Sequence, residues 1–340
     1  MSLEGKKIII ISVSFFNYEK LIKKELESRG AEVDIFDERP SNSTYAKAII
    51  RLKRSAYQIQ INQYYQKLLE EIQTNSYDYF LLIKGEVIPD FFVEKLKVLN
   101  PQMILIYYNY DSFANNPNAK GVIKYFNRKF SFDPIDSKRF GMQFRPLFFA
   151  DDYEKIRTSD NKVKYEAAFI GTAHSDRYLI SEKVKRLLLE QGLKMFTFYY
   201  FPSKMVLKIQ KLYTAALKPI NIRNVSFKSL LHQEIIKIYE ETHCILDINH
   251  PGQTGLTMRT FETLGAGRKL ITTNEEIKKY PFFNDDNVLI VNRHNLLLDP
   301  AFFRKPYQDL GEDMYRKMSL KGWVDEVFIA HTDYWKTYYK

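Results

Sequence analysis

The stretch KIIIISVSFFNYEKLIKKELESRGAEVDIFD, residues 7–37, decides the fold class. It begins with a near-continuous apolar run, which is typical of a strand buried on both faces. Helical spacing of apolar residues follows, and a second apolar run covers 31–37. A strand, a helix and a second strand in this order form a right-handed unit with parallel strands. The stretch therefore predicts the start of a doubly wound α/β domain.

The same alternation continues through the first 150 residues. Further strands are expected at 77–85, 102–111 and 129–133, with helices at 17–29, 44–73, 89–100 and 116–126. The second half repeats the pattern after residue 163. Its expected strands are 165–172, 195–201, 243–249, 269–274 and 287–291, and its clearest helices are 175–192 and 226–242. Two Rossmann-like sheets in tandem are therefore predicted, with ligands expected in a cleft at the carboxyl ends of the strands.

The length of 340 residues also favours two domains over one core. We expect an N-terminal domain over 1–150 and a C-terminal domain over 164–308. The charged, turn-rich segment 151–163 is the predicted linker. The helical segment 309–340 can pack back across either domain.

The formal net charge of +10 predicts a surface that attracts anions. No Lys/Arg block of five or more and no recognisable nucleic-acid module is present, so nucleic acid is not an expected partner. The single cysteine, Cys244, lies in an apolar run and is expected to be a small buried hydrophobe in a reducing, cytoplasmic compartment. The sequence contains no run of eighteen apolar residues, so no membrane span is predicted.

Several kinds of active site are absent from the sequence. The first strand is not followed by G-x-G-x-x-G, and there is no Walker loop and no G-x-S-x-G elbow. No two histidines have metal-ligand spacing, and no Asp-x-Asp occurs. Sugar-nucleotide enzymes that depend on a divalent metal usually carry such an acidic pair. We therefore expect no metal and no cofactor here.

The segment HPGQTGLTMRTFETLGAGRKLITTN, residues 250–274, contains the best candidate binding site. A helix is expected to begin near Leu256, with Thr254 or Gly255 as its cap, so that free amides face a ligand at the positive end of the helix. Arg259 and Glu262 share one face of that helix. The arginine suits a phosphate and the glutamate suits two ribose hydroxyls. The alternative is an exposed surface ion pair.

The part GLTMRTFETLGAGRKLITTN resembles the nucleotide-binding segment of GT-B fold glycosyltransferases, notably the bacterial group that builds lipopolysaccharide core, capsule or spore coat. The pattern is R-x-F-E, a small residue, glycine and an apolar strand. The resemblance implies that Glu262 binds the donor ribose, and that Arg259 faces the diphosphate together with the amides of Thr254, Gly255 and Thr257. Many retaining members carry a glutamate where Thr254 stands, so the stereochemical outcome stays open.

Three further stretches extend the resemblance, and the last of them supplies candidates. FSFDPIDSKRFG, FRPLFF and AAFIGTAHSDRYLI extend the resemblance over most of residues 103–275. The last of them resembles the loop of that family next to the phosphates, or is a capped surface turn. Its candidate residues are Gly171, Thr172, His174 and Arg177.

Two other residues are candidates from their positions alone. His250 borders the expected cleft and is a candidate contact for phosphate or sugar. Asp111 ends a strand of the first domain and is the best carboxylate there to deprotonate an acceptor hydroxyl. Its alternative role is to cap a turn.

A basic stripe is expected on the long helix of the first domain, where Lys47, Arg51 and Arg54 recur at helical spacing. The stripe is either a solvated face or a contact for anionic lipid or for a phosphorylated acceptor.

Together these features predict a metal-independent glycosyltransferase. It would transfer a sugar from a nucleotide diphosphate sugar, held by the second domain, to a cell-envelope polysaccharide or glycolipid held by the first. The expected location is the cytoplasm, at the inner face of the membrane. The alternatives are a non-catalytic sugar or anion sensor with the same fold, and a nucleotide-sugar epimerase.

Overall fold

The computed structural model describes residues 2–14, 17–159, 162–330, 332 and 334–338. The chain divides into two compact domains. The first combines Met1–Pro146 with Leu320–Thr337, and the second combines Leu147–Ser319 with Tyr338–Lys340. Each contains one six-stranded parallel sheet, which confirms the predicted pair of Rossmann-like domains.

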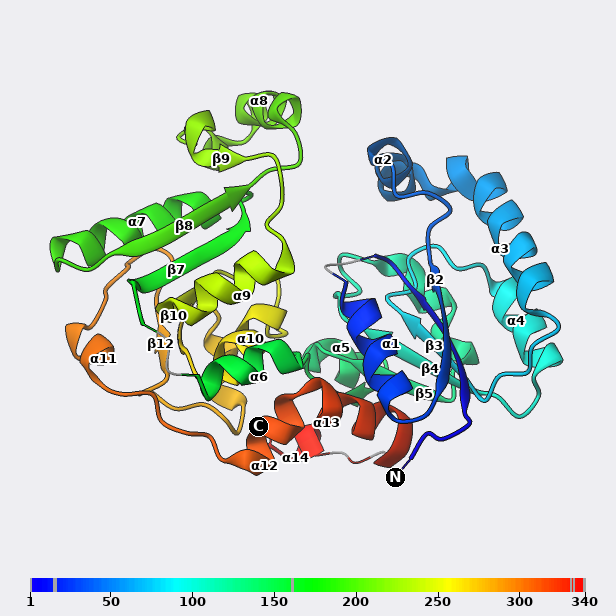
Figure 1. The fold of residues 1–340 in the computed structure, drawn as a ribbon. Coiled ribbons are helices and arrows are strands. Elements are labelled where there is room, and N and C mark those ends of the chain that lie inside the picture. The colour runs from blue at the N-terminus through cyan, green and yellow to red at the C-terminus, as the bar shows by residue number, and fades with distance from the viewer. Residues whose placement is uncertain (1, 15–16, 160–161, 331, 333, 339–340) are drawn as a thin grey trace. The chain divides into compact units, whose positions relative to one another are not determined.

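The first sheet has the strand order β2-β1-β3-β4-β5-β6. Figure 1 labels four of these strands, β2, β3, β4 and β5. Residues 8–11 of β1, which lies between β2 and β3, are fully buried, as expected for a run of isoleucine in a strand covered on both faces. The strands are β1 (Lys7–Ser12), β2 (Glu32–Asp37), β3 (Tyr79–Ile83), β4 (Ile104–Asn109), β5 (Arg128–Ser131) and β6 (Gln143–Phe144). The helices are α1 (Tyr18–Ser28), α2 (Thr44–Lys53), α3 (Gln58–Ile72), α4 (Asp90–Leu99) and α5 (Pro134–Arg139).

Two helices of this domain differ from their prediction. The expected helix 44–73 is interrupted by a 3₁₀ turn, η1 (Arg54–Tyr57), where the Arg54 guanidinium donates to the Val87 carbonyl at 3.0 Å. The expected helix 116–126 is two short 3₁₀ turns, η2 (Pro117–Gly121) and η3 (Ile123–Tyr125). Glycine at the end of η2 weakens a continuous helix there.

The second sheet has the order β12-β11-β10-β7-β8-β9, which is the Rossmann order read from β9. Its strands are β7 (Tyr165–Thr172), β8 (Met195–Tyr200), β9 (Val225–Ser226), β10 (Thr242–Asp247), β11 (Lys269–Thr272) and β12 (Val288–Ile290). The helices are α6 (Asp151–Arg157), α7 (Arg177–Glu190), α8 (Lys204–Tyr213), α9 (His232–Glu240), α10 (Met258–Gly265), α11 (Pro300–Arg304) and α12 (Glu312–Met318). Short 3₁₀ turns are η4 (Ala215–Leu217), η5 (Ile222–Asn224) and η6 (Glu275–Lys279).

Three segments of the second domain differ from the sequence analysis. The expected linker 151–163 contains helix α6, because Tyr153 and Ile156 give its charged sequence a buried face. The expected helix 226–242 begins only at His232, since residues 225–226 pair with β8 as β9. Helix α8 has no counterpart among the predicted elements.

The C-terminal segment returns to the first domain. It consists of α13 (Leu320–Val324), the π-helical turn η7 (Asp325–Ala330) and α14 (Tyr334–Tyr338). Arg145, which is fully buried, pairs through Nε with Glu326 Oε2 at 2.7 Å. The Trp323 ring packs edge-on against Tyr108 at 4.9 Å between centroids. Residues of α13 and η7 thus complete the core of the first domain.

Within the described ranges, no helix has both the length and the apolar character needed to cross a membrane.

Candidate functional site

The strand order of the second sheet creates a switch point between β7 and β10. The chain leaves β7 toward β8 on one side, and it leaves β10 toward β11 on the other. Loops that diverge in this way leave a crevice at the carboxyl ends of the two strands, where ligands of such sheets bind. The residues that follow Thr172 and Asp247 are therefore the ones that form the candidate site.

Asp247, the last residue of β10, organises this crevice. Its side chain is buried, and Oδ2 accepts hydrogen bonds from the hydroxyls of Thr257 at 2.7 Å and Thr260 at 3.1 Å. Its Oδ1 pairs with Arg259 Nη1 at 3.2 Å. One carboxylate thus fixes the first turn of α10 against the end of β10.

Arg259 spans the switch point. Its Nη2 donates to the carbonyl of Ile170 in β7 at 2.5 Å, while Nη1 reaches Asp247 in β10. Glu262, one turn further along α10, is only 7% exposed. The alternative that the two side chains form an exposed surface pair therefore does not describe Glu262, because packing of α10 against its domain covers it.

Arg177 and His174 come from the other side of the switch point, after β7. Arg177 Nη1 lies 3.2 Å from His174 Nε2 and 3.4 Å from Thr172 Oγ1. Burial and the neighbouring Arg177 lower the pKa of His174 to about 4, so the imidazole is neutral at pH 7. A neutral ring next to a guanidinium accepts a hydrogen bond from it without adding charge.

Arg293 joins these residues, and sequence reasoning missed it. It follows β12 and pairs with Asp176 Oδ2 at 2.7 Å, and its Nη2 donates to Asn249 Oδ1 at 2.6 Å. The carboxyl end of β12 was a usable signal, because every parallel strand of a sheet ends at the same edge.

Three arginines gather at this edge. Burial, followed by the nearby Arg259 and Arg293, lowers the pKa of Arg177 to about 10. We call Arg177, Arg259 and Arg293 the arginine cluster. Two carboxylates, Asp176 and Asp247, pair with its members. The buried Nε of Arg177 has no hydrogen-bond partner among the residues that the structure describes. The cluster is thus suited to an anion.

The other predicted residues of the second domain lie around this crevice. Gly171 and Thr172 are the last residues of β7 and do not form a loop. The exposed His250 accepts a hydrogen bond at Nδ1 from the Gly252 amide at 3.3 Å. Thr254 accepts one at its carbonyl from Asn274 Nδ2 at 3.2 Å.

Helix α10 begins later than predicted. Its first residue is Met258 and its cap is Thr257, whose hydroxyl is used by Asp247 and not by the helix. The Gly255 carbonyl accepts from Gln253 Nε2 at 3.0 Å, so Gly255 precedes the helix as part of the loop. At the other end, a Cβ on Gly265 would lie 2.3 Å from the Phe149 ring, so only glycine allows α10 to pack this closely.

Asp111 lies in the first domain, beyond the end of β4. Its Oδ1 accepts from the Ser112 amide at 2.9 Å and from Asn115 Nδ2 at 3.0 Å, and its Oδ2 is 3.8 Å from Lys84 Nζ. The first two contacts are those of a turn-capping aspartate. A catalytic role for Asp111 stays a prediction.

The basic stripe predicted on the first domain is not formed by its three members together. Lys47 is exposed, but Arg54 donates to the carbonyls of Val87 and Ile88. The side chain of Arg51 lies outside the described residues. Backbone bonding draws Arg54 toward its own domain and away from a lipid or acceptor.

Glu38, near the carboxyl edge of the first sheet, is a buried titratable group. Its Oε1 accepts from the amides of Val87 at 2.6 Å and Ile88 at 3.3 Å. Burial raises the pKa of Glu38 to about 7, and the nearby Glu86 adds to the shift. Between about pH 4.5 and 7, Glu38 is therefore protonated in the folded state but ionised in the unfolded chain.

This difference predicts a pH dependence of stability. The stabilisation is fully present below about pH 4.5 and is lost as the pH rises to about 7, on the order of 3 kcal/mol in total. Unfolding in urea at several pH values, followed by the fluorescence of Trp323 and Trp335, reports on the first domain because both lie there. In Glu38→Gln this fall in stability should disappear; an unchanged profile would refute the assignment.

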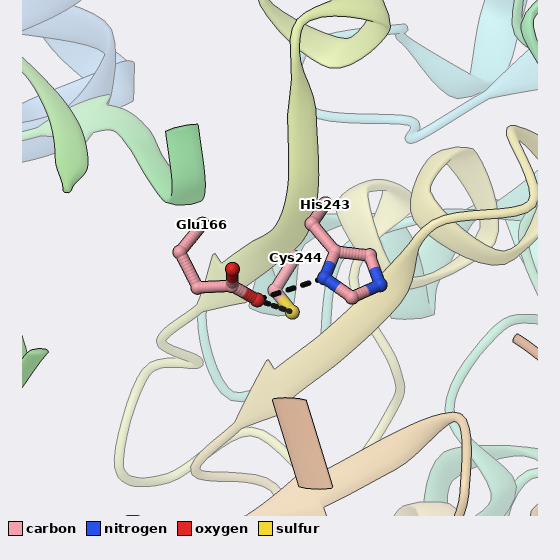
Figure 2. A group of neighbouring side chains, drawn as sticks. All are labelled: Glu166, His243 and Cys244. Atoms are coloured by element: carbon pink, nitrogen blue, oxygen red, sulfur yellow. Dashed lines mark hydrogen bonds and ion pairs between the residues drawn. The ribbon is translucent and has the colours of Figure 1, made fainter. Parts of the chain in front are cut away.

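Glu166, His243 and Cys244 form a second cluster, at the amino ends of β7 and β10 (Figure 2). His243 Nδ1 lies 2.7 Å from Glu166 Oε1, and Cys244 Sγ lies 3.9 Å from the same oxygen. Nitrogen, sulfur and oxygen are ligands that zinc accepts. However, burial raises the pKa of the Cys244 thiol well above its ordinary value, whereas a metal binds the thiolate. The buried Lys269 is also the register partner of Cys244 in β11, and its positive charge would repel a metal cation. The group therefore fits a hydrogen-bonded cluster better than a metal centre.

Comparisons with known proteins were made by sequence and by structure. No known family model and no curated protein matches the sequence. An α,α-trehalose-phosphate synthase (UDP-forming) from Burkholderia xenovorans, solved with glucose-6-phosphate, has a TM-score of 0.61 at 10% identity, covering 94% of this chain and 98% of that one. HepE from Anabaena, solved with UDP and glucose, has a TM-score of 0.53 at 10% identity, covering 95% and 99%.

A UDP-GlcNAc 2-epimerase from Methanocaldococcus jannaschii, solved with UDP-GlcNAc and UDP, has a TM-score of 0.50 at 12% identity and covers 98% of this chain and 96% of that one. What these matches share with the chain is the architecture of two Rossmann-like domains over nearly the full length. The chain therefore has the GT-B fold, as its R-x-F-E segment predicted.

Proposed function

We propose that this protein is a glycosyltransferase that uses a nucleotide diphosphate sugar as donor. The observation that supports this most is the arginine cluster at the switch point of the second sheet, where Asp247 holds Arg259 in place. A diphosphate carries the charge that Arg177, Arg259 and Arg293 would compensate. The solved structures with this fold that are described above have UDP in their names, so UDP is the first nucleotide to test.

The proposed chemistry is transfer at the anomeric carbon of the donor sugar. The bond from that carbon to the diphosphate oxygen breaks, a bond to the acceptor oxygen forms, and the acceptor hydroxyl proton passes to a base. The arginine cluster would stabilise the negative charge that develops on the leaving diphosphate. Asp111 is the proposed base and Glu262 the proposed ribose contact. Transfer that persists in excess EDTA would support a metal-independent reaction.

The acceptor that we propose is a cell-envelope polysaccharide or glycolipid, on the strength of the R-x-F-E resemblance. The alternatives are a non-catalytic sugar or anion sensor and, as a minor possibility, a nucleotide-sugar epimerase, since a UDP-GlcNAc 2-epimerase has the same fold. Incubation of UDP-sugars with and without glycan acceptors separates the possibilities. Transfer requires an acceptor, epimerisation changes the free sugar nucleotide, and a sensor binds UDP without turnover.

The variant Arg177→Ala tests the donor site. We expect its affinity for UDP to fall by roughly ten- to hundredfold, because a hydrogen bond to a charged group contributes about 1.5–3 kcal/mol. Its melting temperature without UDP should be unchanged or slightly higher, because the change removes repulsion from Arg259 and Arg293. Isothermal titration and thermal unfolding measure the two effects.

Two further variants complete this test. Arg304→Ala changes an exposed arginine of α11 in the same domain and should leave UDP affinity unchanged. Glu262→Ala should weaken UDP and uridine alike, since it removes the proposed ribose contact. Unaltered UDP binding in Arg177→Ala would contradict the diphosphate assignment, and unaltered binding in Glu262→Ala would contradict the ribose assignment.

A further inference from the structure

One long stretch of the second domain has a one-sided charge. Residues 191–233 contain no aspartate and no glutamate, whereas the whole chain contains 41 acidic residues. The basic residues of this stretch are Lys194, Lys204, Lys208, Lys211, Lys218, Arg223 and Lys228. Because none of these charges is offset nearby in sequence, the stretch accounts for much of the net charge of +10.

Helix α8, in the middle of this stretch, presents apolar side chains to solvent. Met205 is 70% exposed, Leu212 is 71% and Tyr213 is 84%, and Ile209 is 46% exposed. These positions follow helical spacing, so the four side chains form one stripe. Leu207 is buried on the opposite side and anchors the helix to its domain. The helix therefore has two apolar sides, of which the domain covers only one.

Lysines border the exposed stripe. Lys204 and Lys208 precede Met205 and Ile209 by one position each and are exposed. Lys211 differs, because its Nζ donates to the Ile220 carbonyl at 2.6 Å. We call the four apolar residues together with Lys204 and Lys208 the α8 surface. Figure 1 shows α8 and β9 beyond β8, at one edge of the second sheet.

We propose that the α8 surface binds an anionic lipid surface. An exposed apolar stripe inserts at the boundary between headgroups and acyl chains, while lysine stems reach past it to anionic headgroups. The complete lack of acidic residues over residues 191–233 favours this partner, because nothing in the stretch would repel the headgroups. A second copy of the chain is disfavoured, since a twofold contact would bring this positive surface against itself.

The inference does not depend on the donor site. The α8 surface shares no residue with the arginine cluster. With this surface, the proposed membrane contact lies on the second domain, whereas the sequence predicted it at Lys47, Arg51 and Arg54 of the first domain.

The experiment is co-sedimentation of the full chain with phosphatidylcholine vesicles, either pure or containing about one third phosphatidylglycerol. We expect binding to the anionic vesicles and little to the neutral ones. Replacing Met205, Leu212 and Tyr213 by serine should weaken the binding at least about tenfold, as the stripe is the inserting part. Lys204→Gln with Lys208→Gln should weaken it as well, and added salt should do the same.

Helix α4 provides a matched control. Val98 is 77% exposed there and Leu99 is 47%, next to the exposed Lys95 and Lys97, but the helix also carries Asp90 and Glu94. Val98→Ser and Leu99→Ser with Lys95→Gln and Lys97→Gln should leave vesicle binding unchanged. Near-ultraviolet circular dichroism verifies that all variants fold.

Three outcomes would overturn the proposal. These are equal binding to both kinds of vesicle, loss of binding in the α4 control to the same degree, and full binding by the serine variant. Binding of polyuridylate that responds to the lysine changes but not to the serine changes, without binding to vesicles, would instead identify a nucleic-acid surface.

Discussion

We expect Asp247→Ala to lose measurable UDP binding and to lower the free energy of unfolding of the second domain by roughly 3–5 kcal/mol. The substitution leaves the Arg259 guanidinium without its carboxylate and removes the acceptor for the hydroxyls of Thr257 and Thr260. Because the same carboxylate joins α10 to β10, stability and binding should fail together. Hydrogen exchange of the peptides around β10 measures the first effect, and isothermal titration with UDP measures the second.

Two further variants serve as comparisons for Asp247→Ala. Asp247→Asn keeps an oxygen for the two threonine hydroxyls but not the charge, so its stability should lie between alanine and the original. Asp286→Ala removes a carboxylate from an ion pair with the exposed Lys305, so it should change the stability far less than Asp247→Ala does. If Asp247→Ala unfolds and binds UDP as the original protein does, Asp247 does not organise the site.

The second large effect is expected in the first domain, at Glu326. Glu326→Ala should destabilise the first domain by roughly 3–5 kcal/mol, because it leaves the buried Arg145 without its partner. Gln143 Nε2, which lies 3.2 Å from Glu326 Oε1, also loses an acceptor. Urea unfolding followed by tryptophan fluorescence detects this, since Trp323 and Trp335 are both buried in that domain.

A paired substitution separates charge from packing in this case. Arg145→Met combined with Glu326→Leu removes both charges and keeps much of the volume, and buried pairs replaced in this way often retain stability. We therefore expect the double variant to be more stable than Glu326→Ala. A double variant that is as unstable as the single one would mean that shape, not charge balance, dominates at this position.

The two sheets were predictable because local pattern and final burial agree. The isoleucines of 8–11 form a strand that is covered on both faces, and the sequence contains that information within one short run. Part of the site was predictable for the same reason: Arg259 and Arg177 each follow closely on the end of a predicted strand. Their juxtaposition then follows from the rule that parallel strands end at one edge.

What escaped prediction depends on distant partners. Nothing near Asp247 in sequence distinguishes it from other strand residues, because its partner Thr257 is brought to it by the packing of α10. Arg293 likewise contacts Asn249 only in the folded domain. The apolar residues of α8 do recur at helical spacing, so the helix itself was predictable; what the sequence could not show is that Leu212 and Tyr213 face solvent. Apolar side chains at helical spacing are usually taken to be buried, and those on this side of α8 are exposed.

The return of residues 320–337 to the first domain predicts an order of folding during synthesis. All strands of the second sheet lie within the unbroken stretch Leu147–Ser319, so we expect this sheet to be able to form as soon as the stretch leaves the ribosome. The first domain, although translated earlier, must wait with Arg145 and Tyr108 uncovered until Glu326 and Trp323 emerge. The first domain is therefore translated first, but we expect it to complete its folding last.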